Sequence, residues 1–111
     1  MIYEYRVYEA TPGQIRTLIR VIETAMPFFQ KHGMKVVGVW TTHETISEGS
    51  NQLIYMLAFE DLGHLEKAWR SFRSDSEWRE AHNKLTEDGK ITYSSKFSNY
   101  VMAPTPYSPA K

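Results

Sequence analysis

The 111-residue sequence contains no cysteine, which excludes disulfide bonds, thiolate nucleophiles and cysteine-based metal sites. It also has no excess of charge, because 13 Lys and Arg residues balance 13 Asp and Glu residues. This balance removes the electrostatic argument for nucleic acid as a partner. No apolar run has the length of a membrane span, and the first residues lack the apolar region of a signal peptide. We therefore expect a cytoplasmic protein without membrane insertion.

Motifs for nucleotide binding and serine hydrolysis are also absent, since the sequence has no G-x-G-x-x-G, no P-loop and no G-x-S-x-G. No two of the four histidines have the spacing of a zinc or haem site: His32, His43, His64 and His82. We therefore expect neither a bound metal nor a cofactor.

The length fits a single domain that spans residues 1–111 and has one thin hydrophobic core. Aromatic residues make up 14% of the chain, and they are favoured both in cores and in interfaces. Residues 2–9 alternate between two faces, which predicts a strand. Thr11 and Pro12 are then expected to start a helix, whose apolar residues recur every three or four positions: Ile15, Leu18, Ile19, Ile22, Met26 and Phe29.

Pro27 lies inside this helical pattern, and because proline lacks a backbone N–H we expect a kink or a short break there. Gly33 is expected to end the helix in a left-handed conformation. Two further strands are predicted over residues 34–43 and 52–59, and both are apolar on both faces. Strict alternation in the first of them places Val36 and Trp40 on the same face.

Asp61 is expected to open a second helix, and residues 74–77 have the capping-box spacing that starts a third. A last strand is predicted from about residue 91 to 102, followed by a proline-rich segment at 104–109 that should lie over a surface. Five arginines are expected on solvated helix faces: Arg16, Arg20, Arg70, Arg73 and Arg79.

The predicted element order is strand, helix, two strands, two helices, strand. This order is typical of the α+β, ferredoxin-like split βαβ plan, with a four-stranded antiparallel sheet covered by helices on one face only. Val36, Trp40, Ile54 and Met56 would leave a contiguous apolar patch if the other face were open to water. A second copy stacked on that face would bury the patch, so we expect a homodimer.

The sequence resembles the NIPSNAP family in short segments that follow the family's order along nearly the whole chain. Each segment is weakly diagnostic alone, but together they are specific. The matching segments are residues 2–8, Pro12-Gly13, residues 31–33, residues 37–40, residues 60–62, residues 75–78 and residues 106–109.

The resemblance implies a dimeric α/β-barrel, an architecture also used by small cofactor-free monooxygenases, muconolactone isomerases and chlorite-dismutase relatives. It brings no catalytic residues, because the family has no established set of them. Animal relatives are linked to vesicle traffic and to mitochondrial quality control. In the third strand, where family members often carry a His and a Trp two positions apart, this sequence has Tyr55 and Leu57.

Five residues are candidates for a ligand site. Glu4, Arg6 and Tyr8 share one strand face at spacings of about 6.6 Å. On an enclosed face, Arg6 can bind an anionic group bidentately and Glu4 can act as a base. The alternative is a structural ion pair or a solvated one. Trp40 and Tyr55 can form the floor of an apolar pocket nearby, or else plain dimer core.

Two functions follow from these observations. The first is binding of a small organic ligand, in an enzymatic form as a cofactor-independent monooxygenase or an isomerase. The second is a non-enzymatic protein–protein interaction module, as the animal relatives suggest. A cavity of several hundred Å³ with converging polar groups favours the first, and a solid aromatic interior favours the second.

Overall fold

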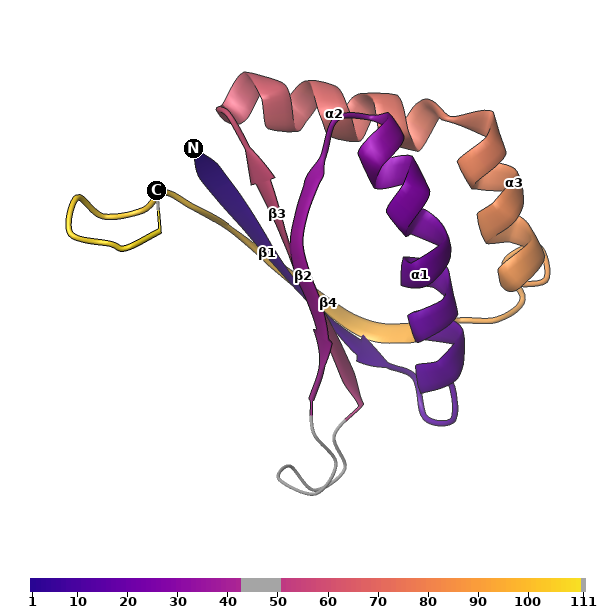
Figure 1. The fold of residues 1–111 in the computed structure, drawn as a ribbon. Helices are drawn as coiled ribbons and strands as arrows, with labels where there is room; N and C mark the ends of the chain where they lie inside the picture. The colour runs from indigo at the N-terminus through magenta and orange to yellow at the C-terminus, as the bar shows by residue number, and fades with distance from the viewer. Residues whose placement is uncertain (43–50, 111) are drawn as a thin grey trace.

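The computed structural model describes residues 1–42 and 51–110, and in these residues the elements follow the predicted order. They are β1 (Ile2–Ala10), α1 (Ile15–Lys31), β2 (Lys35–Thr41), β3 (Gln52–Phe59), α2 (Leu62–Ser74), α3 (Ser76–Leu85) and β4 (Ser94–Met102) (Figure 1). His43 lies outside the described residues.

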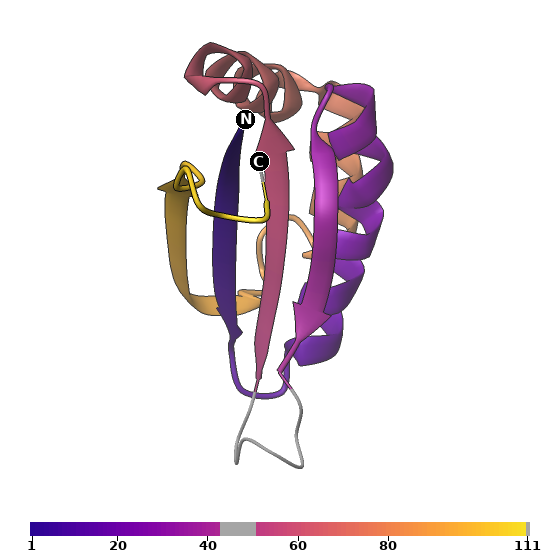
Figure 2. The same cartoon turned by 60° about the vertical axis from the view of Figure 1, so that its left-hand side comes forward.

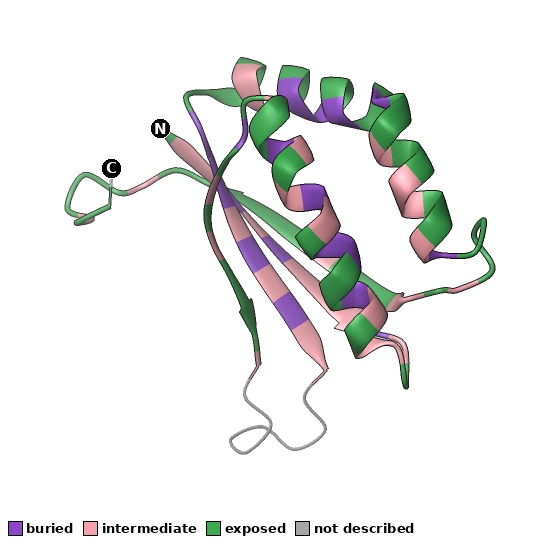
Figure 3. Cartoon of the chain, turned by 45° about the vertical axis from the view of Figure 1, so that its right-hand side comes forward, coloured by how far each residue is buried: buried purple, intermediate pink, exposed green. Residues whose placement is uncertain are grey.

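The four strands form one antiparallel sheet in the order β2-β3-β1-β4 (Figure 2). This is the strand order of the split βαβ plan, so the predicted ferredoxin-like class is confirmed. The three helices lie on one face of the sheet, and α1 and α2 turn their buried residues toward it (Figure 3). Large side chains pack against one another between the two layers: Phe29, Leu53, Tyr55, Leu57, Phe59, Trp69 and Phe72.

Strand pairing decides which side chains of β1 face the helices. Arg6 lies opposite Tyr55 of β3, and Glu4 lies opposite Leu57. Tyr55 and Leu57 belong to the core and are at most 1% exposed. Because paired residues share a face and alternate residues repeat it, Glu4, Arg6 and Tyr8 all lie on the helix-covered face.

The prediction that Val36 and Trp40 share a face is wrong. The register between β2 and β3 shifts between Val36 and Gly38, as at a β-bulge. Val36 therefore lies opposite Leu57 and packs against the core, whereas Trp40 lies opposite Ile54 on the other face. One extra residue in a strand inverts the alternation of all residues after it.

Helix α1 begins later than predicted, and no break interrupts it at Pro27. Residues 11–13 form a turn in which Gly13 has φ 81°, so the helix begins only after Gln14. It continues through Pro27 without a break. Phe29, two residues later, is 1% exposed, so packing on the core holds the second part of the helix in place. Gly33 has φ 76°, which confirms the predicted left-handed end.

Aspartate side chains cap the N-terminal ends of α2 and α3. Asp61 caps α2 as predicted, because its carboxylate accepts from the backbone N–H of His64. At α3 the capping residue is Asp75 and not Ser74, since Ser74 still belongs to α2. The last strand begins at Ser94, three residues later than predicted.

The face of the sheet away from the helices is open and aromatic. Trp40 and Tyr100 are 50% and 57% exposed on it, and Tyr100 lies opposite Tyr5. The proline-rich segment leaves β4 on this side of the sheet (Figures 1 and 2). Within residues 1–42 and 51–110, none of the helices has the length and hydropathy that crossing a bilayer needs.

Candidate functional site

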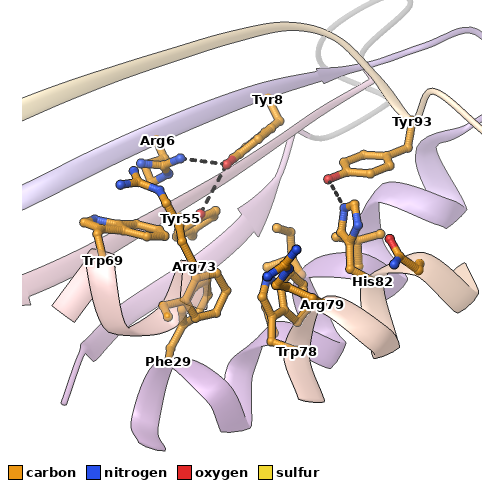
Figure 4. A pocket seen from close by; sticks show the side chains of 15 residues that line it. Arg6, Tyr8, Phe29, Tyr55, Trp69, Arg73, Trp78, Arg79, His82 and Tyr93 are labelled. Atoms are coloured by element: carbon orange, nitrogen blue, oxygen red, sulfur yellow. Dashed lines mark hydrogen bonds between the residues drawn. The ribbon is translucent and has the colours of Figure 1, made fainter. Parts of the chain in front are cut away.

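A cavity of about 440 Å³ lies between the helices and the covered face of the sheet (Figure 4). Arg6 and Tyr8 of β1 and Tyr55 of β3 line it on the sheet side. Aromatic side chains of the helices form much of the remaining wall: Phe29, Trp69, Phe72 and Trp78. The volume falls within the range of roughly 300–1,000 Å³ that is typical of small-molecule sites.

Arg6 is the buried cation of this cavity, with 9% of its surface exposed. One terminal nitrogen donates to a carboxylate oxygen of Glu4 at 2.7 Å, and the other donates to the phenol oxygen of Tyr8 at 3.0 Å. The guanidinium carbon lies over the ring of Trp69, 4.4 Å from its centroid, and over that of Phe97 at 4.5 Å. The charge is therefore held between two aromatic faces, a favourable arrangement for a desolvated cation.

Burial alone would lower the pKa of Arg6, but the phenols of Tyr55 and Tyr8 and the carboxylate of Glu4 raise it above the ordinary 12.5. Burial also raises the pKa of Tyr55 well above 10.0. At physiological pH Arg6 is thus a permanent cation and Tyr55 a neutral phenol that can donate a hydrogen bond.

Glu4 holds Arg6 in place. It is 2% exposed, and its oxygens accept from the indole N–H of Trp69 at 2.6 Å and the side-chain amide of Asn99 at 3.0 Å, besides Arg6. Glu4 does not line the 440 Å³ cavity. Because all three of these hydrogen bonds come from side chains of the protein, this geometry supports the structural ion pair for Glu4.

Two kinds of donor on the sheet side lack an acceptor. The Nε of Arg6 is buried and has no hydrogen-bond partner among the described residues. The hydroxyls of Tyr8 and Tyr55 lie 3.4 Å apart, which is long for such a pair. Only one of the two phenol protons can bridge the pair, whichever hydroxyl donates. The other proton has no acceptor within residues 1–42 and 51–110.

Arg73 of α2 and Arg79 of α3 line the helix side of the same cavity. Both are exposed at its rim, and the guanidinium carbon of Arg73 lies 5.4 Å from the ring centroid of Trp69. The predicted solvated helix face is thus only part of their environment. No described Asp or Glu pairs with Arg73 or Arg79 within 4.0 Å, and none lines the cavity.

His82 of α3 adds a titratable group to the cavity wall. Its Nε2 lies 2.9 Å from the hydroxyl of Tyr93, which also lines the cavity. Burial lowers the pKa of His82 below its ordinary 6.5, so the imidazole is neutral at physiological pH and can accept a proton. The sequence offers one weak signal for this role, because Trp78, four positions earlier, places His82 on the inward face of the helix.

The candidates from the sequence are thus divided between two faces. Glu4, Arg6, Tyr8 and Tyr55 come together in one hydrogen-bonded chain on the covered face. Trp40 lies on the opposite face of the sheet and cannot form a pocket floor with Tyr55. The β-bulge in β2 is the physical cause.

A second cavity of about 590 Å³ lies between α2 and β4 and shares Arg6, Trp69 and Arg73 with the first. Arg70 lines this second cavity but not the first. In the part of the chain that the structure describes, no group of three or more His, Asp and Glu residues could hold a metal ion.

Comparison with known proteins relates the whole chain to one family. The sequence pattern of the family described as NIPSNAP matches residues 3–109. An uncharacterized NIPSNAP domain protein from Burkholderia xenovorans is 17% identical with a TM-score of 0.78, over 98% of this chain and 99% of that one. A nipsnap family protein of unknown function from Agrobacterium tumefaciens is 22% identical with a TM-score of 0.78, over 98% and 92%.

A more distant likeness extends to an antibiotic biosynthesis monooxygenase. That protein is 6% identical with a TM-score of 0.62, and the match covers 96% of this chain and 100% of that one. At such identities the likeness concerns the fold alone, and it agrees with the ferredoxin-like plan. No curated protein matches the sequence.

Proposed function

We propose, from the premise that the chain belongs to the NIPSNAP family, that it binds a compact organic molecule in the cavity between helices and sheet. An oxygen of that molecule, either anionic or carbonyl, accepts hydrogen bonds from Arg6 and from the pair Tyr8 and Tyr55. Its apolar body packs against the aromatic side chains that the helices contribute.

The observation that carries this proposal is the pair of unsatisfied donors. A buried N–H or O–H without an acceptor costs about 1–3 kcal/mol, so native proteins seldom retain one without a use. Here the Nε of Arg6 has no acceptor among the described residues, and Arg6 lines the cavity together with Tyr8 and Tyr55, whose hydroxyls share one bridging proton. An oxygen of the ligand gives the guanidinium and the tyrosine pair a further acceptor.

His82 gives the same cavity a proton acceptor, and this favours an enzymatic form of the proposal. Removal of a proton from a carbon next to a carbonyl leaves negative charge on the carbonyl oxygen, where the donors of Arg6 and Tyr55 stabilise it. Return of the proton to another carbon completes an isomerisation. Transfer of electrons from the anion to O2 begins a cofactor-independent oxygenation, which is the second possible outcome.

The alternative, a protein–protein interaction module, would be favoured if the aromatic interior were solid. The cavity and its converging donors support ligand binding instead.

We also propose that the open face of the sheet binds a second copy of the chain. Trp40, Tyr100 and Met102 are 36–57% exposed there, and soluble monomers rarely leave such an apolar patch in water.

A fragment screen by ligand-observed NMR tests the binding site. Small carboxylic acids and ketones should bind the wild type, and Tyr55→Phe, which removes only the hydroxyl, should weaken them about five- to fifteenfold, as expected for one lost hydrogen bond. Arg6→Met should abolish binding. Arg16→Met, on the exposed face of α1, is the matched control and should bind like the wild type. Equal binding by all four proteins, or no binding by the wild type, contradicts the proposal.

A further inference from the structure

The cavity carries more positive charge than a single ligand oxygen requires. Arg6 is already neutralised by Glu4 at 2.7 Å. Arg73 and Arg79 have no acidic partner among the described residues, although the chain as a whole is neutral. Two uncompensated cations thus line a cavity that contains no carboxylate of the protein.

These cations come from a different layer than the sheet-side donors. Arg73 belongs to α2 and Arg79 to α3, whereas Arg6 projects from β1 (Figure 4). Trp69 lies four positions before Arg73, and Trp78 lies one position before Arg79. Both tryptophans contribute flat apolar surface to the wall of the same cavity. A ligand that satisfies both layers therefore needs a flat apolar body and a polar group for each layer.

The surroundings of Arg73 strengthen its attraction for a negatively charged group of the ligand. Attraction between a carboxylate and an exposed arginine is weak in water, but it strengthens where the surroundings are partly apolar. The ring of Trp69 lies beside the guanidinium of Arg73 and excludes water from that side. A planar guanidinium also matches a carboxylate or phosphate in geometry.

From this arrangement we propose that the ligand is a planar, ring-containing acid with two oxygen-bearing groups. One group is an acceptor for Arg6 and the tyrosine pair, and the other is a carboxylate or phosphate held by Arg73 and Arg79. This inference rests on the proposed ligand site and specifies the class of molecule that it takes. Arg73 and Arg79 set specificity, and neither takes part in proton transfer.

Titration of the purified full chain with benzoate and with the three isomeric benzenedicarboxylates tests this inference. The three isomers sample three spacings of the two carboxylates. At least one of them should bind about five- to tenfold more tightly than benzoate, since each partly exposed charge pair contributes up to about fivefold. The advantage should shrink as salt is added, because the rim is exposed to screening.

Variants identify the residues responsible. Arg79→Gln and Arg73→Gln should each reduce the ratio of dicarboxylate affinity to benzoate affinity, measured on the same variant. Arg70→Gln is the matched control, since Arg70 lies on α2 but lines only the other cavity. If benzoate binds and depends on Tyr55, but no dicarboxylate binds more tightly, this inference fails while the proposed function stands. If neither benzoate nor any dicarboxylate binds, both fail.

Discussion

Replacement of Arg6 by methionine should lower the free energy of unfolding by about 3 kcal/mol. The change leaves the carboxylate of Glu4, 2% exposed, without the counter-ion that now lies 2.7 Å away. Loss of one partner of a buried ion pair costs about 3–5 kcal/mol. Trp69 and Asn99 still donate to Glu4, which keeps the loss at the lower end of that range. Methionine retains apolar bulk, so the loss reports charge rather than a cavity.

Urea unfolding at one fixed protein concentration measures this loss, with circular dichroism as the signal. Tryptophan fluorescence is avoided because Arg6 lies over the ring of Trp69, so the substitution itself would change the emission. Arg16→Met, on the exposed surface of α1, should change stability by no more than about 0.5 kcal/mol. Adding Glu4→Gln to Arg6→Met removes the unpaired charge and should restore about 1–2 kcal/mol. A loss below about 1 kcal/mol for Arg6→Met would show that the pair behaves as an exposed one and would refute the reasoning.

Three further predictions follow from other parts of the molecule. Lys31 and His32 hold the pKa of Asp75 well below its usual 3.8, so the stability that Asp75 contributes is present above about pH 4 and lost as the pH falls toward the lowered pKa. The urea midpoints of wild type and Asp75→Asn should therefore converge on acidification, and a constant difference contradicts this. The imidazole of His82, followed by NMR, should titrate below 6.5, because its burial favours the neutral form, and a higher value contradicts that environment. Light scattering should give a mass of about twice 12.9 kDa for the wild type and for the control Tyr107→Glu. Trp40→Glu should give the mass of a monomer, and a monomeric wild type contradicts the open-face dimer.

Periodicity alone was enough to place three members of the site. Alternation along β1 puts Glu4, Arg6 and Tyr8 on one face whatever the rest of the chain does. The element order then predicts the split βαβ plan, which the strand order confirms. Which face the helices cover depends on pairing with β3, and the sequence does not determine that register.

The remaining parts of the site depend on features with a weak local signature or none. The β-bulge that turns Trp40 away from Tyr55 comes from one extra residue in β2, where the isolated Gly38 is a weak signal of a bulge and where a Cβ would meet the ring of Trp40. In the sequence, Arg73 and Arg79 cannot be told from arginines on solvated helix faces. They line the cavity only because α2 and α3 pack over the sheet. His82 likewise becomes a candidate proton acceptor only through its burial beside Tyr93.

The most direct test of the ligand site is a crystal structure of the wild-type protein with its tightest-binding acid from the fragment screen. We predict an oxygen of that acid within about 2.7–3.2 Å of the guanidinium of Arg6 and of the hydroxyl of Tyr8 or Tyr55. The ring of the acid should lie against the aromatic side chains of α1, α2 and α3. Density for the acid outside the cavity, or a cavity filled by side chains that have closed over Arg6, would contradict the account.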